Sequence, residues 1–242
     1  MPKAFLLLLF LLLQPFLITA QSVRLKYYCN QLNRLNTQVS EGKVAKQTAA
    51  KNFRVVIQKI YEESKFKSNA AWVFPLAGYS ASAIGGISGN GYNDKGYNYL
   101  DGNKHKSHPA HDIFIKDQDQ DNIDDRTQKP VSVLAITDGV VLACTNAWLA
   151  NSSLRGGKYI WLYHPQLHII TYYAHNRKVF VVPGDVVKQG QAIAEVGRTG
   201  FNASKPRSPT HLHFSAFKLV NWVPVPFNPY HNLTKAISHE IH

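Results

Sequence analysis

Two short stretches that combine histidine with aspartate or with a second histidine are the parts of this sequence best suited to chemistry. The first reads His-Pro-Ala-His-Asp and runs from His108 to Asp112; the second reads Thr-His-Leu-His-Phe and contains His211 and His213. Side chains two or four residues apart on an extended strand point to the same face. Each stretch can therefore direct a pair of metal-ligating groups into one site.

A zinc centre is the hypothesis that these stretches support. His108, Asp112 and one histidine of the later pair would give three protein ligands, leaving the fourth tetrahedral position open for water as in catalytic zinc sites. A histidine pair alone is weak evidence, because such pairs also occur as hydrogen-bonded residues at sheet edges. In an extended stretch, His111 would face away from Asp112. A further histidine, His175, ends an apolar run and is unremarkable by itself.

The residues after Asp112 have the pattern of short β-strands. Turn signals such as Asp138-Gly139 and Gly156-Gly157 separate them, and no helical period intervenes. The β-favouring segments are 113–115, 131–136, 140–144, 159–163, 168–173, 179–182, 192–196 and 212–217. This pattern predicts a mainly β fold with two antiparallel sheets, a sandwich or barrel-sandwich hybrid. The Gly- and Asn-rich residues 72–106 predict loops over this scaffold, where binding groups tend to lie.

A basic helical extension is predicted before the β domain. Apolar residues recur at helical spacing from Ala45 to Ile60, with a start at Ser40-Glu41, and a shorter helix near Val23 to Leu35 would complete a hairpin. The whole chain has 27 Lys and Arg against 15 Asp and Glu, and residues 21–68 alone hold ten against three. This charge is either a solvated face or a surface that adheres to an anionic cell envelope. Nucleic acid is not an expected partner, because no nucleic-acid motif accompanies the charge.

The first twenty residues predict export. Lys3 precedes an apolar run from Ala4 to Ile18, and Ala20 is a small residue at the expected cleavage point. A periplasmic or secreted protein follows, with an uncleaved membrane anchor as the alternative. The sequence contains no second apolar run long enough to span a membrane, so no transmembrane span is expected in the mature chain. Export permits one bridge between Cys29 and Cys144, or they are two buried thiols.

Four motifs of this chain, in their order and spacing, resemble those of the lysostaphin/LytM-type zinc metallopeptidases, which cut peptide bonds in bacterial peptidoglycan. They are His108-x-x-x-Asp112, Tyr173-Ala174-His175, the Gly184 to Gly200 segment with its Gly-Asp-Val-Val and Gly-Arg-Thr-Gly elements, and Thr210-His-Leu-His-Phe214. The resemblance covers roughly 74–217, and it implies a duplicated hybrid motif fold. Together with the export signal and the helical extension predicted above, it divides the chain into a signal peptide (1–20), the extension (21–70), the peptidase domain (71–225) and a tail (226–242).

The resemblance also implies roles for individual residues. His108, Asp112 and His213 would bind one zinc ion per chain, and His175 and His211 would be the catalytic histidines, with a peptidoglycan peptide as substrate. His111 is a candidate for an additional or substitute ligand. Which catalytic histidine is the base, and which bond is cut, stay open at this point.

Alternatives to an enzyme are a catalytically silent cell-wall-binding or activator module of the same fold, and an adhesion or signalling protein with a structural zinc. A structural site would need a fourth protein ligand, for which His111 is the obvious residue. A second metal is also considered, because Asp117, Asp119 and Asp121 resemble the first half of a calcium loop. The sixth position of that loop is Asn122 where glycine is expected, so a solvated acidic loop is the competing interpretation.

Overall fold

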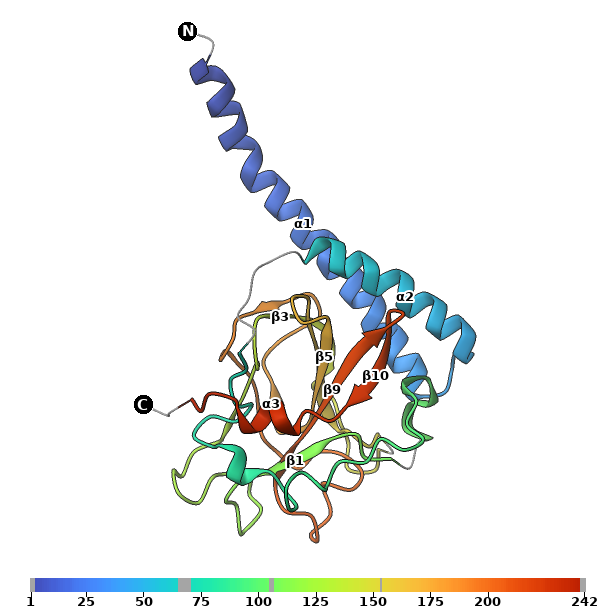
Figure 1. Ribbon diagram of the computed structural model, residues 1–242, viewed down its shortest axis with the longest axis vertical. Helices are drawn as coiled ribbons and strands as arrows, with labels where there is room; N and C mark the ends of the chain where they lie inside the picture. Colours follow the sequence, from blue (N-terminus) through green and yellow to red (C-terminus); the bar gives the residue numbers. More distant parts are fainter. Residues whose placement is uncertain (1–2, 65–70, 105–106, 153, 240–242) are drawn as a thin grey trace.

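The computed structural model describes residues 3–64, 71–104, 107–152 and 154–239 (Figure 1). Its helices are α1 (Lys3–Ser40), α2 (Lys46–Glu63) and α3 (Tyr230–Thr234), with 3-10 helices η1 (Ala81–Ala83) and η2 (Tyr99–Lys104). Its strands are β1 (His111–Phe114), β2 (Ser132–Leu134), β3 (Gly139–Thr145), β4 (Lys158–His164), β5 (Ile169–Asn176), β6 (Lys178–Val179), β7 (Val186–Val187), β8 (Ala192–Glu195), β9 (His211–Val220) and β10 (Val223–Phe227).

Two antiparallel sheets form the body of the protein. The large sheet has the strand order β1-β9-β5-β4-β3-β7, with β10 also paired to β9, and the small sheet has the order β2-β8-β6. One face of the large sheet packs on the small sheet, burying residues such as Val133 on β2, Ile193 on β8, Leu162 on β4 and Phe214 on β9. The predicted mainly β, two-sheet fold is confirmed, and most predicted strands are present. The Gly- and Asn-rich stretch before β1 forms loops and short 3-10 turns.

The opposite face of the large sheet is covered by the hairpin of α1 and α2 (Figure 1). Leu32 of α1 and Phe53 and Ile57 of α2 are at most 2% exposed, and they share an apolar cluster with Trp161 of β4 and Phe217 of β9. Burying large apolar side chains against a sheet is strongly stabilising, at about 1.5 to 3 kcal/mol for each. The helical extension is therefore part of the hydrophobic core.

The limits of the two helices differ from those predicted. The second helix does not start at Ser40-Glu41: Ser40 is the last residue of α1, and α2 begins at Lys46. Gly42 has φ 68°. The Gly42 amide donates to the Val39 carbonyl (3.0 Å), and the Lys43 amide donates to the Gln38 carbonyl (2.8 Å). This pattern is a Schellman motif, which glycine permits because it has no Cβ. It ends α1 at the position where the sequence suggested that a helix begins.

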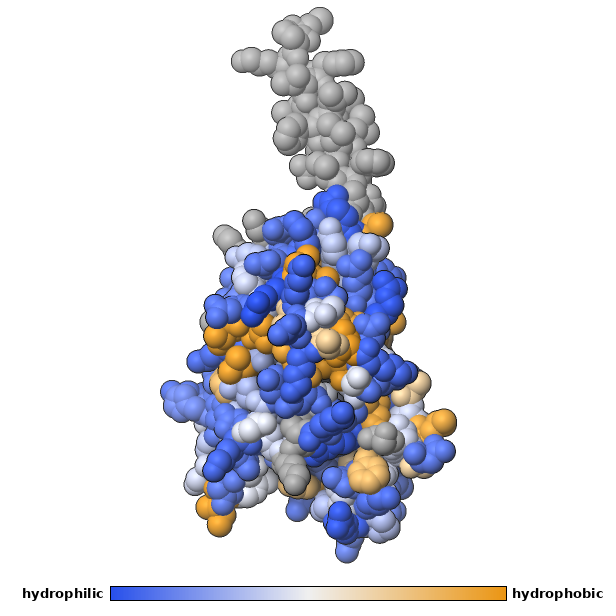
Figure 2. All heavy atoms as spheres, turned by 90° about the vertical axis from the view of Figure 1, so that its right-hand side faces the viewer, coloured by the Kyte–Doolittle hydropathy of each residue, from blue (hydrophilic) through white to orange (hydrophobic). Residues whose placement is uncertain are grey.

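Hydrophilic side chains cover much of the surface on the hairpin side, with an apolar gathering at mid-height (Figure 2). Several cations of the hairpin are paired with carboxylates, among them Arg24 with Glu63 (2.7 Å) and Lys59 with Glu62 (2.9 Å). The predicted signal peptide (1–20) lies within or before the first half of α1, where the structure does not describe the side chains. Among the described residues, no helix is long and apolar enough to cross a membrane.

The C-terminal residues extend the β domain. The strands β7 and β10 and the helix α3 were not predicted, and β10 spans the proposed domain limit at 225. Leu233 of α3 is 1% exposed, and Ile237 forms a β-bridge with Val73. The described part of the tail thus packs with the domain that precedes it. Cys29 and Cys144 are both free thiols, so the bridge between them is absent; of the two thiols expected to be buried, Cys29 is buried and Cys144 is only partly buried.

Candidate metal centre

The three residues predicted to be zinc ligands come together at one end of the large sheet. Asp112 of β1 lies directly opposite His213 of β9, and His108 is held just before β1 by a β-bridge to Asn93. The Asp112 Oδ1 atom lies 3.2 Å from His108 Nε2 and 3.0 Å from His213 Nδ1. One ligand atom from each of the three residues lies within 4.8 Å of the other two. This grouping of two imidazole nitrogens and a carboxylate oxygen suits a single zinc ion.

The surroundings hold Asp112 and His213 in forms that can bind a cation, whereas the hydrogen bond with Asp112 raises the pKa of His108. Burial by itself raises the pKa of Asp112, but hydrogen bonds from His108 and His213 outweigh it and hold that pKa well below its usual range. The Nδ1 atom of His108 lies 3.0 Å from the Gly91 carbonyl, to which it donates, and this leaves Nε2 directed at Asp112. Burial lowers the pKa of His213, which favours the neutral imidazole that a metal needs.

The two predicted catalytic histidines lie beside this cluster. The ring of His175 is 4.9 Å from that of His211 and 5.4 Å from that of His213, centroid to centroid. His211 Nε2 is 3.7 Å from Asp112 Oδ1. Each of the two directs its Nδ1 at a backbone carbonyl, His175 at Thr199 (2.8 Å) and His211 at Pro209 (2.7 Å). Nδ1 is therefore the protonated nitrogen in the neutral ring, and Nε2 is available to accept a proton.

His175 reaches the site through an irregularity in β5. Tyr173 points into the core between the sheets, and strict alternation would send His175 the same way. The β4–β5 register shifts here, since Ile160 pairs with Tyr173 while Lys158 pairs with Asn176, which leaves an extra residue on β5. His175 has φ 67°, a left-handed conformation that is unusual for a residue with a Cβ. Such bulges re-aim side chains, and strain of this kind collects at functional sites.

Close backbone approach completes the setting of His175. A Cβ atom added at Gly200 would lie 2.8 Å from His175 Nδ1 and 2.4 Å from the Arg155 carbonyl oxygen. The side chain of Thr199 is fixed on both sides, accepting from the Lys158 amide (2.9 Å) and donating to the Asn176 carbonyl (2.8 Å). The Gly-Arg-Thr-Gly element therefore positions the carbonyl that orients His175, a role that sequence spacing alone did not reveal.

His111 does not join the cluster. It lies on the opposite face of β1, is 1% exposed, and places Nε2 2.8 Å from the Asn228 side chain. Its ring packs between those of Tyr92 and Tyr230. Strand alternation predicted this orientation, and the structure gives His111 a packing environment on the far side of the strand from Asp112.

The acidic loop after β1 is held together by its own carboxylates. Asp117 accepts hydrogen bonds from the amides of Asp121 (3.0 Å) and Asn122 (2.9 Å) and from the hydroxyl of Thr210 (2.5 Å), which directly precedes β9. Oxygen atoms of Asp117, Asp119 and Asp125 lie within 4.8 Å of one another, and Asp121 is not in this group.

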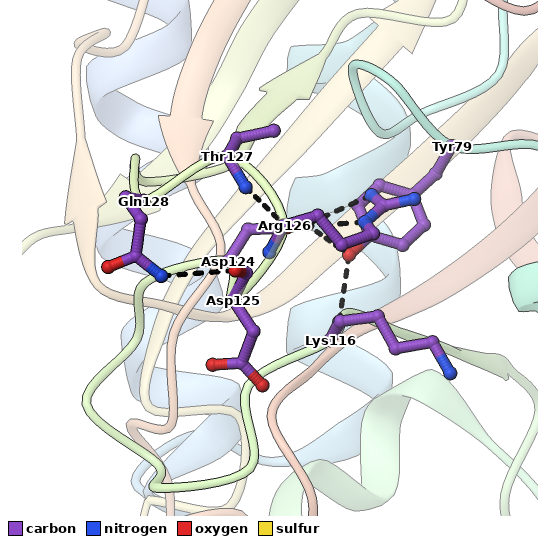
Figure 3. Close-up of polar contacts among 7 residues, drawn as sticks. All are labelled: Tyr79, Lys116, Asp124, Asp125, Arg126, Thr127 and Gln128. Carbon is purple, nitrogen blue, oxygen red and sulfur yellow. Dashed lines mark hydrogen bonds and ion pairs between the residues drawn. The ribbon is translucent and has the colours of Figure 1, made fainter.

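Asp124, which is fully buried, closes the same loop (Figure 3). It accepts hydrogen bonds from the Tyr79 hydroxyl and from the guanidinium of Arg126 (2.9 Å), whose Cζ atom lies 4.2 Å from the centroid of the Tyr79 ring. Through these contacts the acidic residues stabilise the loop. The contacts do not support calcium binding.

A cleft of about 260 Å³ opens beside the candidate ligands. Its lining includes the predicted residues His108, Asp112, His175, His211 and His213. It also includes residues that sequence reasoning missed, among them Asn36, Val39 and Ser40 of α1, Tyr97, Arg155, Trp161 and Tyr172. In the sequence, Trp161 and Tyr172 read as ordinary strand residues and Tyr97 as a loop residue, and only the packing of the helices on the sheet shows that they border a cleft.

Comparisons with known proteins agree with this geometry. Residues 119–226 match the model of peptidase family M23. A Lipoprotein NlpD/LppB homolog of Pseudomonas aeruginosa is 39% identical over 83 residues, which is 34% of this chain and 24% of that protein. An uncharacterized metalloprotease of Buchnera aphidicola is 34% identical over 92 residues, 37% of this chain and 21% of that protein. The chain thus spans about a quarter or less of these relatives.

A solved structure, a putative glycyl-glycine endopeptidase LytM from Ruminococcus gnavus, is 19% identical, with a TM-score of 0.49 over 92% of this chain and 89% of that one. The family match contains His175, His211 and His213, while His108 and Asp112 precede it and join them in space. Over residues 119–226 the chain is therefore similar to peptidase family M23.

Proposed function

We propose that this protein is an exported zinc-dependent endopeptidase that hydrolyses peptide cross-links of bacterial peptidoglycan. The observation that carries the proposal is the convergence of Asp112, His108 and His213 on one point, with His175 and His211 beside it. The family match and the basic, apolar start of the sequence support it further.

The side chains at this point fit a zinc ion. Two imidazole nitrogens and one carboxylate oxygen form a donor set typical of catalytic zinc, and three protein ligands leave one coordination position for a further group. His108, Asp112 and His213 would hold the ion. Zinc bound there would polarise the scissile carbonyl and lower the pKa of a water molecule toward about 7.

His175 and His211 would then handle protons and developing charge. Burial lowers the pKa of His175 well below its usual value, and the neighbouring imidazoles of His211 and His213 lower it further. Its Nε2 is therefore unprotonated at neutral pH and can accept a proton from the attacking water. His211 Nε2, 3.7 Å from the Asp112 carboxylate, would first take up a proton; it would then donate a hydrogen bond to charge that develops on the substrate, or pass that proton to the leaving amine.

Digestion of purified sacculi tests this function. The protein would be stripped with a chelator, reloaded with zinc and incubated with sacculi, and the soluble muropeptides would be identified by mass spectrometry. Asp112→Asn keeps the shape of the side chain but removes its negative charge, so it should lose both zinc and activity. Asp119→Asn is the matched control, because Asp119 is exposed in the acidic loop and does not line the cleft.

Release of peptide products that depends on added zinc and on Asp112 supports the proposal. A wild-type protein that holds zinc and binds sacculi but releases no product would instead support the catalytically silent binding module. Tight zinc binding that survives in Asp112→Asn would contradict the assignment of this residue as a ligand.

A further inference from the structure

The carbonyl group that orients His211 belongs to a proline in an exposed part of a loop. His211 Nδ1 lies 2.7 Å from the carbonyl oxygen of Pro209, in the loop 196–210 that joins β8 to β9. Proline has no backbone N–H, so no hydrogen bond from its own nitrogen can hold Pro209 in place. Because Pro209 is also exposed, the position of its carbonyl depends on how its neighbours in the loop are held.

The side chain of Arg198 binds this loop on both sides of Pro209. Its Nη1 atom donates to the Ser208 carbonyl (2.5 Å) and to the Thr210 hydroxyl (3.3 Å). Its Nη2 atom donates to the Lys205 carbonyl (2.9 Å). A guanidinium presents its donors in one rigid plane, so a single side chain can hold three acceptors at fixed positions relative to one another.

The acidic loop after β1 holds the same segment. The Thr210 hydroxyl donates to Asp117 Oδ2 (2.5 Å), so this hydroxyl links the carboxylate of Asp117 to the guanidinium of Arg198. Thr210 is 1% exposed and Asp117 is 7% exposed, and buried polar groups need such partners. Gln120 of the acidic loop donates from Nε2 to the Pro206 carbonyl (2.8 Å). The residues before β9 are therefore fixed by side chains from two separate parts of the chain.

The two central residues of the Gly-Arg-Thr-Gly element thus act on different histidines. The Thr199 carbonyl accepts a hydrogen bond from Nδ1 of His175 (2.8 Å). Arg198 holds the chain on either side of Pro209, whose carbonyl accepts from Nδ1 of His211. In each neutral ring, a proton held on Nδ1 leaves Nε2 without one. Arg198 is not among the residues that line the cleft, so it acts on His211 through the loop.

We propose that Arg198 is a positioning residue for His211. It fixes the Pro209 carbonyl, and this carbonyl holds the His211 ring with its proton on Nδ1 and with Nε2 3.7 Å from Asp112 Oδ1. Without the guanidinium, three hydrogen bonds to the loop are lost and the carbonyl is free to move away from the ring. The effect on turnover rests on the proposed peptidase function, whereas the orientation of the ring does not depend on it.

A double-mutant cycle tests whether Arg198 acts through His211. Zinc content, kcat and KM on a cross-linked muropeptide dimer would be measured for the wild type, Arg198→Ala, His211→Ala, the double variant and Arg198→Lys. Arg54→Ala is the matched control, because Arg54 also donates to a backbone carbonyl, that of Asn221 (3.1 Å). Arg54 is exposed on α2 and does not line the cleft.

Arg198→Ala should lower kcat by about 10- to 100-fold, with normal zinc content and little change in KM, because a displaced catalytic group slows the reaction more than it weakens binding. Arg198→Lys, which keeps the charge but not the planar fork, should fall between this variant and the wild type. In the His211→Ala background, Arg198→Ala should change kcat by less than about 2-fold, because the group that it positions is gone. Arg54→Ala should have the kcat of the wild type. An equal loss of kcat in both backgrounds, or a wild-type kcat in Arg198→Ala, would overturn the positioning role.

NMR of the imidazole nitrogens in the zinc-loaded protein gives a second measurement, which does not depend on cleavage. At about pH 8, where an ordinary histidine is neutral, His211 should be a single Nδ1–H tautomer in the wild type and in Arg54→Ala. Arg198→Ala should show a mixture of the two tautomers. The unchanged single tautomer in Arg198→Ala would also overturn the positioning role. A wild type that cleaves no dimer, with mixed tautomers in Arg198→Ala, would refute the peptidase function and leave the positioning of the ring standing.

Discussion

His211 and His213 are two residues apart on β9, yet their alanine variants should fail in different ways. His213 places Nδ1 3.0 Å from Asp112 Oδ1 inside the candidate ligand group, whereas His211 Nε2 is 3.7 Å from the same oxygen and lies at the edge of that group. His213→Ala should abolish stoichiometric zinc, because a site with three protein ligands has none to spare. His211→Ala should keep zinc and the fold but lose turnover.

The size of the loss follows from how firmly His211 is held. Its side chain is only 7% exposed, and its Nδ1 is anchored 2.7 Å from the Pro209 carbonyl, so the ring is already oriented before substrate binds. A positioned acid, base or oxyanion donor contributes on the order of 10²- to 10⁴-fold in rate, or about 3 to 5 kcal/mol of activation free energy. His211→Ala should therefore fall in this range in kcat.

The assay measures zinc per chain by metal analysis and the cleavage of one muropeptide dimer, for both variants and for His231→Ala. His231 is the matched control, because it is exposed on α3 and does not line the cleft. Wild-type zinc with normal turnover in His211→Ala, or a metal-free His211→Ala, would refute the division of roles. Full zinc occupancy in His213→Ala would refute its assignment as a ligand.

Three further predictions concern stability, backbone geometry and surface charge. Burial lowers the pKa of His164 to about 4, so below pH 6.5 the unfolded state takes up a proton that the folded state refuses. This residue should lower the free energy of unfolding by about 3 kcal/mol between pH 6.5 and 4. In His164→Gln, the free energy of unfolding measured in urea should therefore depend less steeply on pH than in the wild type. The same pH dependence in both proteins would contradict the burial argument. Gly200→Ala adds a Cβ atom at a residue with φ 113°, 2.8 Å from His175 Nδ1. The variant should have a lower turnover and a normal zinc content. Turnover equal to that of the wild type would show that the close approach at Gly200 does not matter. If the hairpin adheres to an anionic envelope, replacing the exposed Lys26 and Lys51 by Gln should weaken binding to sacculi, and more at low salt than at high salt. Binding equal to that of the wild type at every ionic strength would exclude adhesion through these residues.

Strand alternation in the sequence predicted the site where the backbone is regular. It placed His108 and Asp112 on one side of β1 and His111 on the other, and the structure has this arrangement. It could not predict the orientation of His175, because the bulge that redirects this residue depends on the register between β4 and β5. Register between strands is a tertiary property, and no local pattern encodes it. The family resemblance supplied His175 where periodicity could not.

The hairpin shows a second limit of local patterns. Helical spacing predicted two helices and their apolar faces, but the basic composition indicated a role only for the charged outer surface. In the structure the inner face of the hairpin packs on the large sheet, which Leu32, Phe53 and Ile57 cover. Short turns also escaped prediction, since the glycine that ends α1 and the prolines of β10 read as loop signals.

The packing of the hairpin connects the fold of the extension to the chemistry of the cleft. The sheet face that carries His211 and His213 continues into Phe217, which is 1% exposed only because the helices lie over it. Removing α1 and α2 would expose this apolar surface to water and take Asn36 and Val39 out of the lining of the cleft at the same time. A deletion of the hairpin would therefore change stability, substrate fit and surface charge together. Single substitutions on its inner face, its outer face and at the cleft separate these three contributions, because each face meets a different partner: the sheet, the solvent or the substrate.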